Sequence, residues 1–267
     1  MPEPSDGRDS GADKDPDQDQ AMGERLESFY RSRKEAGDLQ TTEIPISMLM
    51  AFDKLMQMRD GLPEVLKDGL QGGSPAGSAA VRDLSGHLQR VAAFARLLAL
   101  KAGMSEAEAN FIKQVSPMHD IGKWAIPEAI LHKPSALTPE EWEIMKTHTQ
   151  AGYEMLKDCK LEVLQMGALV AIQHQEKFDG TGYPIGLKGG QIHIYSRITT
   201  VADVFDALGS ERSYKQAWAV EEIILYFQEG RGSHFDPDLV DLLLANLEEF
   251  LAIRESFPTW GMRGDAG

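Results

Sequence analysis

Hydrophobic residues recur at helical spacing through most of the chain. The clearest stripe lies in the first segment after residue 78, and it consists of Leu84, Leu88, Val91, Ala95 and Leu98. Gly103 then provides a typical helix stop. The same spacing predicts further helices over residues 162–175, 191–210, 217–229 and 237–252. Alternating patterns typical of strands are nearly absent, so the sequence predicts an all-α domain.

Helix start signals support this pattern at two places. Ser105 and Glu108 stand three residues apart, as in a capping box, where each side chain accepts a hydrogen bond from the backbone of the other residue. Thr138 and Glu141 repeat this signal, and Thr138 is followed by a proline, which suits the first helical position. We expect the helix that begins there to run on to Leu156.

The segments outside this domain differ from it in composition. Residues 1–21 carry seven acidic side chains and almost no apolar ones, which predicts a disordered tail. Residues 22–71 regain helical spacing and form either a packing appendage or a helix pair for dimerisation or signal input. A linker rich in Gly, Ser and Pro is expected at 72–77, the main domain at 78–256 and a C-terminal tail at 257–267.

Composition and charge limit the function classes. The 267 residues carry a net charge of -15, which argues against binding a nucleic acid polymer. Cys159 is the one cysteine, so no internal disulfide can form and a cysteine-based zinc site is not expected. No apolar run approaches the roughly 20 residues needed to span a bilayer, and the acidic N-terminus does not resemble a secretory signal. We therefore expect a cytoplasmic protein with no membrane segment.

Candidate chemistry begins at an adjacent histidine and aspartate, His119 and Asp120, with Lys123 one helical turn beyond. Such a pair alone is commonly an ordinary hydrogen-bonded pair in a core. Other predicted helices add further candidate groups of the same two kinds, namely His87, His148, His174 and Asp203. Asp203 lies in an apolar run, where an unpaired carboxylate would be costly to bury.

Metal ions account best for imidazoles and carboxylates gathered from several helices. A mixed set of these ligands suits iron, manganese, zinc or nickel better than magnesium or calcium, which prefer oxygen ligands. Asp120 could bridge two ions about 3.5 to 4 Å apart, an arrangement that activates water and stabilises the transition state of phosphodiester hydrolysis.

These residues resemble the HD superfamily of metal-dependent phosphohydrolases, and two longer motifs narrow the resemblance to its HD-GYP subfamily. The first motif runs from His174 to Pro184 (His-Gln-Glu-Lys-Phe-Asp-Gly-Thr-Gly-Tyr-Pro) and enters a glycine-rich stretch that ends at Gly190. The second covers residues 201–208 and continues through Arg212, Tyr214 and Lys215. The resemblance implies an HD-domain helical bundle extended by C-terminal GYP helices, with a glycine-rich GYP loop and a helical appendage at the N-terminus.

The resemblance also implies a role for each matching residue. The implied metal ligands are His87, His119, Asp120, His148, His174 and Asp203. Asp120 and Lys123 would act in catalysis, Asp120 as the bridge between ions and Lys123 by neutralising phosphate charge. The implied substrate contacts are Tyr183, Asp206, Arg212 and Lys215.

The activity implied by the resemblance is the metal-dependent hydrolysis of cyclic di-GMP to linear pGpG by a metal-bound hydroxide, with further hydrolysis to GMP left open. Two other classes also remain open: a catalytically weak scaffold that binds a cyclic dinucleotide, and an HD phosphohydrolase for another nucleotide. The expected partners are a small-molecule cyclic dinucleotide and, through the N-terminal helices, a second copy of the chain.

Two departures from the family pattern bear on the number of metal ions. Gln175 stands where a second histidine usually follows His174, and an amide oxygen is a weaker ligand than an imidazole nitrogen. Asp83 stands where three-metal members are expected to carry glutamate, and its side chain is shorter by one methylene. Asp83 and Gln175 are thus additional but poor ligand candidates. We expect two divalent ions, iron or manganese, with one bound weakly and the linear dinucleotide as the main product.

Overall fold

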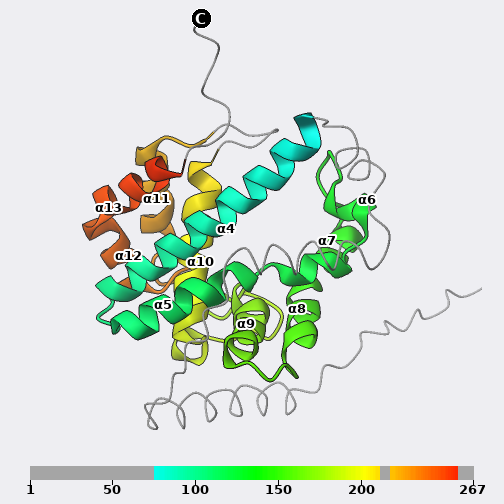
Figure 1. Cartoon of the computed structure of the whole chain (residues 1–267), viewed down its shortest axis with the longest axis horizontal. Coiled ribbons are helices and arrows are strands. Elements are labelled where there is room, and N and C mark those ends of the chain that lie inside the picture. The colour runs from blue at the N-terminus through cyan, green and yellow to red at the C-terminus, as the bar shows by residue number, and fades with distance from the viewer. Residues whose placement is uncertain (1–74, 211–216, 258–267) are drawn as a thin grey trace, which may run out of the picture. The chain divides into compact units, whose positions relative to one another are not determined.

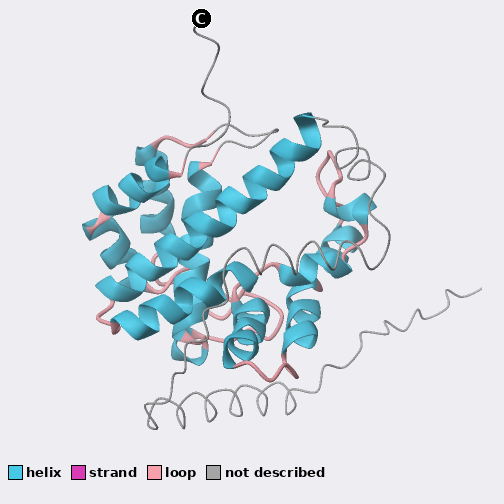
Figure 2. Cartoon of the chain, viewed as in Figure 1, coloured by secondary structure: helices cyan, strands magenta, loops and turns pink. Residues whose placement is uncertain are grey.

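The computed structural model describes residues 75–210 and 217–257, with side chains from Gly86 onward. Over these ranges the regular structure is helical, without a strand and with one isolated bridge between Arg231 and Phe235 (Figure 2). The prediction of an all-α fold is confirmed. The tail and the helical segment predicted before residue 72 lie outside the described residues, and so does the C-terminal tail beyond Phe257.

The described helices follow one another along the chain, with a long glycine-rich connection between α9 and η3 (Figure 1). The α-helices are α4 (Pro75–Lys101), α5 (Glu106–Val115), α6 (Glu128–Leu131), α7 (Pro139–Lys146), α8 (His148–Leu156), α9 (Glu162–Gln173), α10 (Ile194–Gly209), α11 (Val220–Gly230), α12 (Pro237–Ala245) and α13 (Leu247–Ser256). Three short 3-10 helices connect them: η1 (Ser116–Met118), η2 (Ile121–Ala125) and η3 (Gly189–Gln191).

Helix α4 begins earlier than the sequence pattern indicates. It starts at Pro75, inside the stretch 72–77 that was expected to be a linker. Proline suits the first position of a helix because its missing N–H would have no intrahelical partner there. The alanines that follow are strong helix formers. The Gly, Ser and Pro content of this stretch therefore led to a predicted helix start that is too late.

The core forms where α4 packs against α5, α10, α12 and α13. Its aromatic centre joins three of these helices, because the ring of Phe94 lies 5.1 Å from that of Phe205 and 5.8 Å from that of Phe250. All three rings are fully buried. Edge-to-face and offset contacts of this kind add to the free energy gained by burying the rings, and they fix α4 and α10 side by side.

Both predicted capping boxes are present, at Ser105 for α5 and at Thr138 for α7. The helix expected from Thr138 to Leu156 is nevertheless two helices, α7 and α8, divided at Thr147. The Thr147 hydroxyl donates to the carbonyl of Ile144 at 2.7 Å. Such back-bonding by a threonine competes with the regular ladder and bends helices, and here α8 starts again at His148.

Close backbone packing joins η2 to α8 at two glycines. A Cβ atom added to Gly122 would lie 1.9 Å from the carbonyl oxygen of His148 and 2.3 Å from the backbone nitrogen of Gly152. Gly152 in turn has the Cβ of Ala171, on α9, within 2.9 Å of such an added atom. Only residues without a side chain allow the turn after Asp120 to approach α8 this closely.

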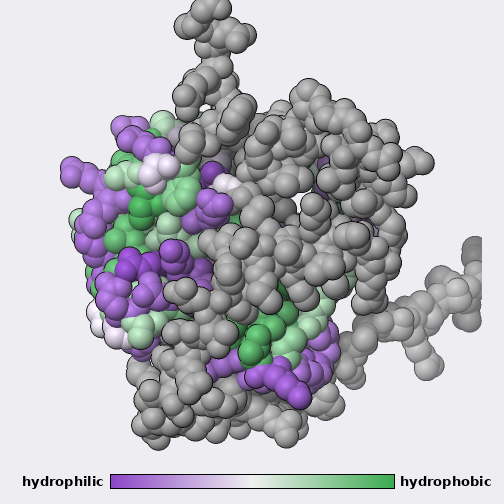
Figure 3. Space-filling model, viewed as in Figure 1, coloured by the Kyte–Doolittle hydropathy of each residue, from purple (hydrophilic) through white to green (hydrophobic). Residues whose placement is uncertain are grey.

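The surface of the described part contains both hydrophobic and polar residues. On the face seen in Figure 3, hydrophobic residues gather in patches between polar ones. Within the described ranges, no helix combines the length and the apolar character that crossing a bilayer requires.

Gly122→Ala is expected to destabilise the fold by about 3 kcal/mol or more, because the new methyl group would meet backbone atoms that cannot move aside. Gly190→Ala is the matched control, since nothing lies within 4 Å of the atom it adds. Thermal or denaturant unfolding of the two variants measures the difference. Equal stability of both variants would contradict the close packing of η2 against α8.

Candidate metal centre

Five elements bring six of the sequence-predicted residues to one place. His87 lies on α4 and Asp203 on α10, while His119 and Asp120 occupy the turn between η1 and η2. The other two are the first residue of α8, His148, and the C-cap of α9, His174. The carbonyl of His174 accepts a hydrogen bond from Thr200 of α10 at 2.8 Å, which fixes the end of α9 to α10.

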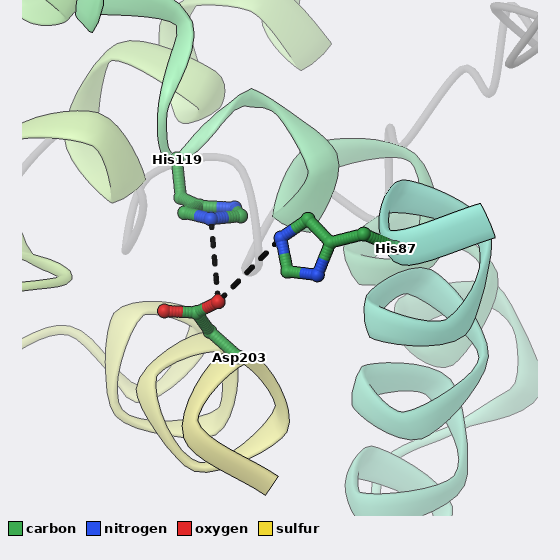
Figure 4. Close-up of side chains that lie close together, drawn as sticks. All are labelled: His87, His119 and Asp203. Carbon is green, nitrogen blue, oxygen red and sulfur yellow. Dashed lines mark ion pairs between the residues drawn. The ribbon is translucent and has the colours of Figure 1, made fainter. Parts of the chain in front are cut away.

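The six residues divide into two groups of three, and in each group one ligand atom per residue lies within 4.8 Å of the others. The first group is His87, His119 and Asp203, shown in Figure 4. Its Asp203 carboxylate lies 3.6 Å from Nε2 of His87 and 3.7 Å from Nε2 of His119. The second group is Asp120, His148 and His174.

Each of the four histidines is held through Nδ1. The acceptor for three of them is the backbone carbonyl three residues earlier, at 2.8 Å for His119, 2.7 Å for His148 and 2.9 Å for His174. The acceptor for His87 is instead the carboxylate of Asp206, at 2.8 Å. Because these oxygens only accept hydrogen bonds, Nδ1 carries the proton and the lone pair of a neutral ring is at Nε2.

Three of the Nε2 atoms lie in positions that suit metal coordination better than hydrogen bonding within the described part of the chain. Nε2 of His148 lies 3.2 Å from Nε2 of His174, and two lone pairs at this separation repel each other unless a cation lies between them. Nε2 of His119 is buried and has no hydrogen-bond partner within the described part of the chain. Because each ring is fixed by a hydrogen bond at Nδ1, these Nε2 atoms are well placed to coordinate divalent metal ions.

Asp120 faces both groups. Its Oδ1 lies 3.5 Å from Nε2 of His148 and 3.6 Å from Nε2 of His174, and its Oδ2 lies 3.3 Å from Nε2 of His119. This is the placement that a bridging carboxylate requires. The Nζ of Lys123 donates to the same Oδ2. Although burial opposes it, the charges of Lys123 and His119 hold the pKa of Asp120 well below its usual range.

The electrostatics of the histidines also favour cations. Burial alone would lower the pKa of His119, but the carboxylates of Asp120 and Asp203 outweigh it and raise that pKa to about 9. The site thus favours a positive charge at Nε2 of His119, which a metal ion would supply in place of a proton. Burial, reinforced by the charge of His174, lowers the pKa of His148 to about 4, so that this ring stays neutral near pH 7.

The glycine-rich loop after α9 borders this centre. Glu176 holds it, because its buried carboxylate accepts hydrogen bonds from the backbone nitrogens of Ile185, Gly186 and Leu187 at 2.8 to 3.1 Å. The ring of Tyr183 in this loop lies 6.3 Å from the ring of Trp142 and 5.8 Å from the Nζ of Lys146, both on α7. Burial, together with the charge of Asp120, raises the pKa of Tyr183 above its ordinary value, so its hydroxyl remains a hydrogen-bond donor.

Asp206 is placed differently from the expectation that it contacts a ligand. Its side chain is 1% exposed, and its two oxygens accept hydrogen bonds from His87 and Arg90. Although burial opposes it, the bonds from His87 and Arg90 lower the pKa of Asp206. A sequence pattern that marks a functional carboxylate does not reveal whether it faces the substrate or the back of a metal ligand.

Three other predicted site residues are wholly or partly outside the described structure, and a fourth, Gln175, lies within it. Arg212 and Lys215 lie outside the described residues, and Asp83 is within α4 but its side chain lies outside them. The carbonyl of Gln175 accepts a hydrogen bond from the backbone nitrogen of Tyr183 at 3.2 Å. This bond ties the loop to the residue next to His174.

Two residues in this region went unrecognised in the sequence. Glu176 was recognised only as part of a motif. No sequence pattern indicates that a carboxylate will accept the backbone hydrogen bonds of a loop. Arg90 is 2% exposed and binds Asp206. Its position three residues after His87, on the same helical face, was the available signal.

Comparison with known proteins identifies a matching domain family and similar proteins. The HD domain family model matches residues 78–239. A 3'3'-cGAMP-specific phosphodiesterase 2 of Vibrio cholerae is 45% identical over 209 residues, which make up 78% of this chain and 40% of that protein. The cyclic di-GMP phosphodiesterase response regulator RpfG of Xanthomonas campestris is 44% identical over 179 residues, 67% of this chain and 47% of that protein. The chain therefore spans less than half the length of these two relatives.

A solved structure agrees on the fold. Bd1817, a HDG"Y"P protein from Bdellovibrio bacteriovorus, superposes with a TM-score of 0.51 over 90% of this chain and 75% of that one, at 17% identity. Family model, relatives and fold all point the same way as the sequence motifs. The chain belongs to the HD domain family, in the HD-GYP group that those motifs predicted.

Proposed function

We propose that the protein is a metal-dependent phosphodiesterase that hydrolyses a cyclic dinucleotide, with cyclic di-GMP as the first candidate. The observation that carries the proposal is the pair of three-residue clusters, in which every imidazole is held at Nδ1 and Asp120 of the second cluster also faces His119 of the first. This arrangement suits two adjacent cations, and paired cations are the common means of cleaving phosphodiesters.

The residues of the chain have distinct tasks in this proposal. When bound, the divalent ions would supply Lewis-acid stabilisation of the phosphate and an activated water. Asp120 and the histidines orient the site, and Asp120 carries one carboxylate oxygen to each cluster. Lys123, whose side chain is 41% exposed beside Asp120, neutralises charge on an arriving phosphate. Tyr183, in the glycine-rich loop, keeps its proton and can donate a hydrogen bond to the bound substrate.

The substrate class rests on relatives. RpfG and a Thermotoga maritima protein, 43% identical over 158 residues, are named as cyclic di-GMP phosphodiesterases. The Vibrio cholerae relative is named for 3'3'-cGAMP and aligns over a longer part of this chain, which makes 3'3'-cGAMP the second candidate. Arg212 and Lys215 remain proposed phosphate or guanine contacts, because arginine offers a planar fork for either group.

The metal content follows from the ligands. Imidazole mixed with carboxylate suits iron or manganese, and we propose two ions per chain. Gln175 would leave the second cluster weak, and the main product would then be the linear dinucleotide.

Incubating the metal-loaded protein with cyclic di-GMP, 3'3'-cGAMP and linear nucleotides tests the function. Ring opening of one cyclic dinucleotide supports the proposal. Binding without turnover would instead indicate a scaffold, and turnover of linear nucleotides alone would indicate another HD phosphohydrolase.

Removing a shared ligand should abolish turnover. Asp120→Asn removes the charge that both clusters use, so we expect hydrolysis to fall by about 100-fold or more and bound metal to decrease. Asp241→Asn is the matched control, because Asp241 is exposed and pairs with Arg231 at the surface. Product chromatography and elemental analysis measure both effects. Near-normal activity of Asp120→Asn would rule out the bridging role.

Restoring a histidine at position 175 should strengthen the site. An imidazole is a better ligand than an amide, so Gln175→His is expected to raise metal content or the rate of the second cleavage to mononucleotide. Elemental analysis and the ratio of mononucleotide to linear dinucleotide provide the measurement. If the natural protein already holds three tight ions and releases mononucleotide as fast as it opens the ring, this interpretation of Gln175 is wrong.

A further inference from the structure

We propose that Asp206 and Arg90 are positioning residues for His87, and that they make the cluster of His87, His119 and Asp203 the tighter of the two metal sites. The inference rests on the metal-binding part of the proposed function and does not depend on which nucleotide is the substrate.

Hydrogen bonds link His87 of the first cluster to Asp206, and Asp206 to Arg90. The Nδ1 of His87 donates to Oδ2 of Asp206 at 2.8 Å. Arg90 donates to both oxygens of that carboxylate, from Nε to Oδ1 at 2.5 Å and from Nη2 to Oδ2 at 3.0 Å. Its Nη2 also reaches the hydroxyl of Ser210 at 3.1 Å. A two-point contact between arginine and a carboxylate fixes direction as well as distance.

Helices α4 and α10 supply two of the three ligands of the first cluster, His87 and Asp203, and also the two supporting residues. On α4, Arg90 follows His87 by three residues, and on α10, Asp206 follows Asp203 by three. Residues at this spacing share a helical face. The contact between α4 and α10 therefore sets the ligand pair and the supporting pair together, one helical turn apart.

Burial makes this support effective. The side chains of Asp206 and Arg90 are 1% and 3% exposed, so water does not compete for their hydrogen bonds. An isolated carboxylate at this depth would be costly, and Arg90 compensates its charge. The carboxylate thus stays fixed against the ring of His87.

His87 differs in this way from the other three histidines. Their Nδ1 atoms donate to neutral backbone carbonyls, whereas His87 donates to a charged group. A carboxylate acceptor orients the ring and raises the basicity of its Nε2. The second cluster lacks such a support among the described residues, and its carboxylate, Asp120, also pairs with Lys123. The first cluster should therefore bind its ion more tightly.

Single-site backgrounds test the inference. His148→Ala leaves the first cluster intact and His87→Ala leaves the second, so each variant should bind one Co²⁺, more tightly in His148→Ala. Adding Asp206→Asn to His148→Ala is expected to weaken Co²⁺ binding about 10- to 100-fold and to shift the visible absorption of the bound ion. Adding it to His87→Ala should leave affinity and spectrum unchanged.

The matched control is Asp236→Asn in the His148→Ala background. Asp236 is also buried and pairs with an arginine, Arg197, and its side-chain hydrogen bonds among the described residues, to Arg197 and the backbone of Asp238, do not involve either cluster. It should lower the melting temperature without changing Co²⁺ affinity. Equal effects of Asp206→Asn and Asp236→Asn on affinity would reduce Asp206 to a structural residue and overturn the inference.

The role of Arg90 has its own measurement. In the His148→Ala background, Arg90→Gln should weaken Co²⁺ binding, Arg90→Lys should restore part of the loss, and Arg90→Gln should add little once Asp206→Asn is present, because Arg90 acts through Asp206. Unchanged affinity in all these variants would overturn the positioning role alone. A natural protein that binds no divalent metal would overturn the proposed function as well.

Discussion

The site depends on one constraint, which is that each imidazole is tied at Nδ1 so that its Nε2 must point inward. Tying the rings this way leaves the Nε2 atoms of His148 and His174 3.2 Å apart, and it leaves the buried Nε2 of His119 without a hydrogen bond to any described residue. A folded chain tolerates such an arrangement only if something else satisfies those atoms. The cost of building the centre is therefore recovered when cations bind, and metal binding and local stability should be linked.

Backbone packing is what allows the rings to meet. Gly122 and Gly152 let the turn that carries His119 and Asp120 approach α8 within backbone contact, and this brings Asp120 opposite His148. Glu176 performs a similar task for the loop, because its carboxylate replaces the side-chain packing that a glycine-rich loop lacks. Residues without chemistry of their own thus determine whether the ligands reach bonding distance.

The sequence predicted those features that depend on local signals. Helices α5 and α7 begin where their capping boxes predicted, and the six proposed ligands gather where the motifs suggested. The break between α7 and α8 escaped prediction because the hydroxyl bond of Thr147 competes with helix continuation without altering the apolar spacing. The placement of Asp206 escaped as well, since it depends on how α4 packs against α10, which is a tertiary contact.

The pair of Arg90 and Asp206 is hard to explain by stability alone. The free energy needed to remove two charges from water is about as large as the stabilisation from their attraction. An apolar pair of similar volume is often at least as stabilising. The neighbouring core shows the alternative, because Phe94 and Phe205 join the same two helices through aromatic contact. The ion pair occurs instead where α4 and α10 meet next to His87, the position at which a fixed negative charge can orient a ligand. Its location is therefore better explained by the metal centre than by the fold.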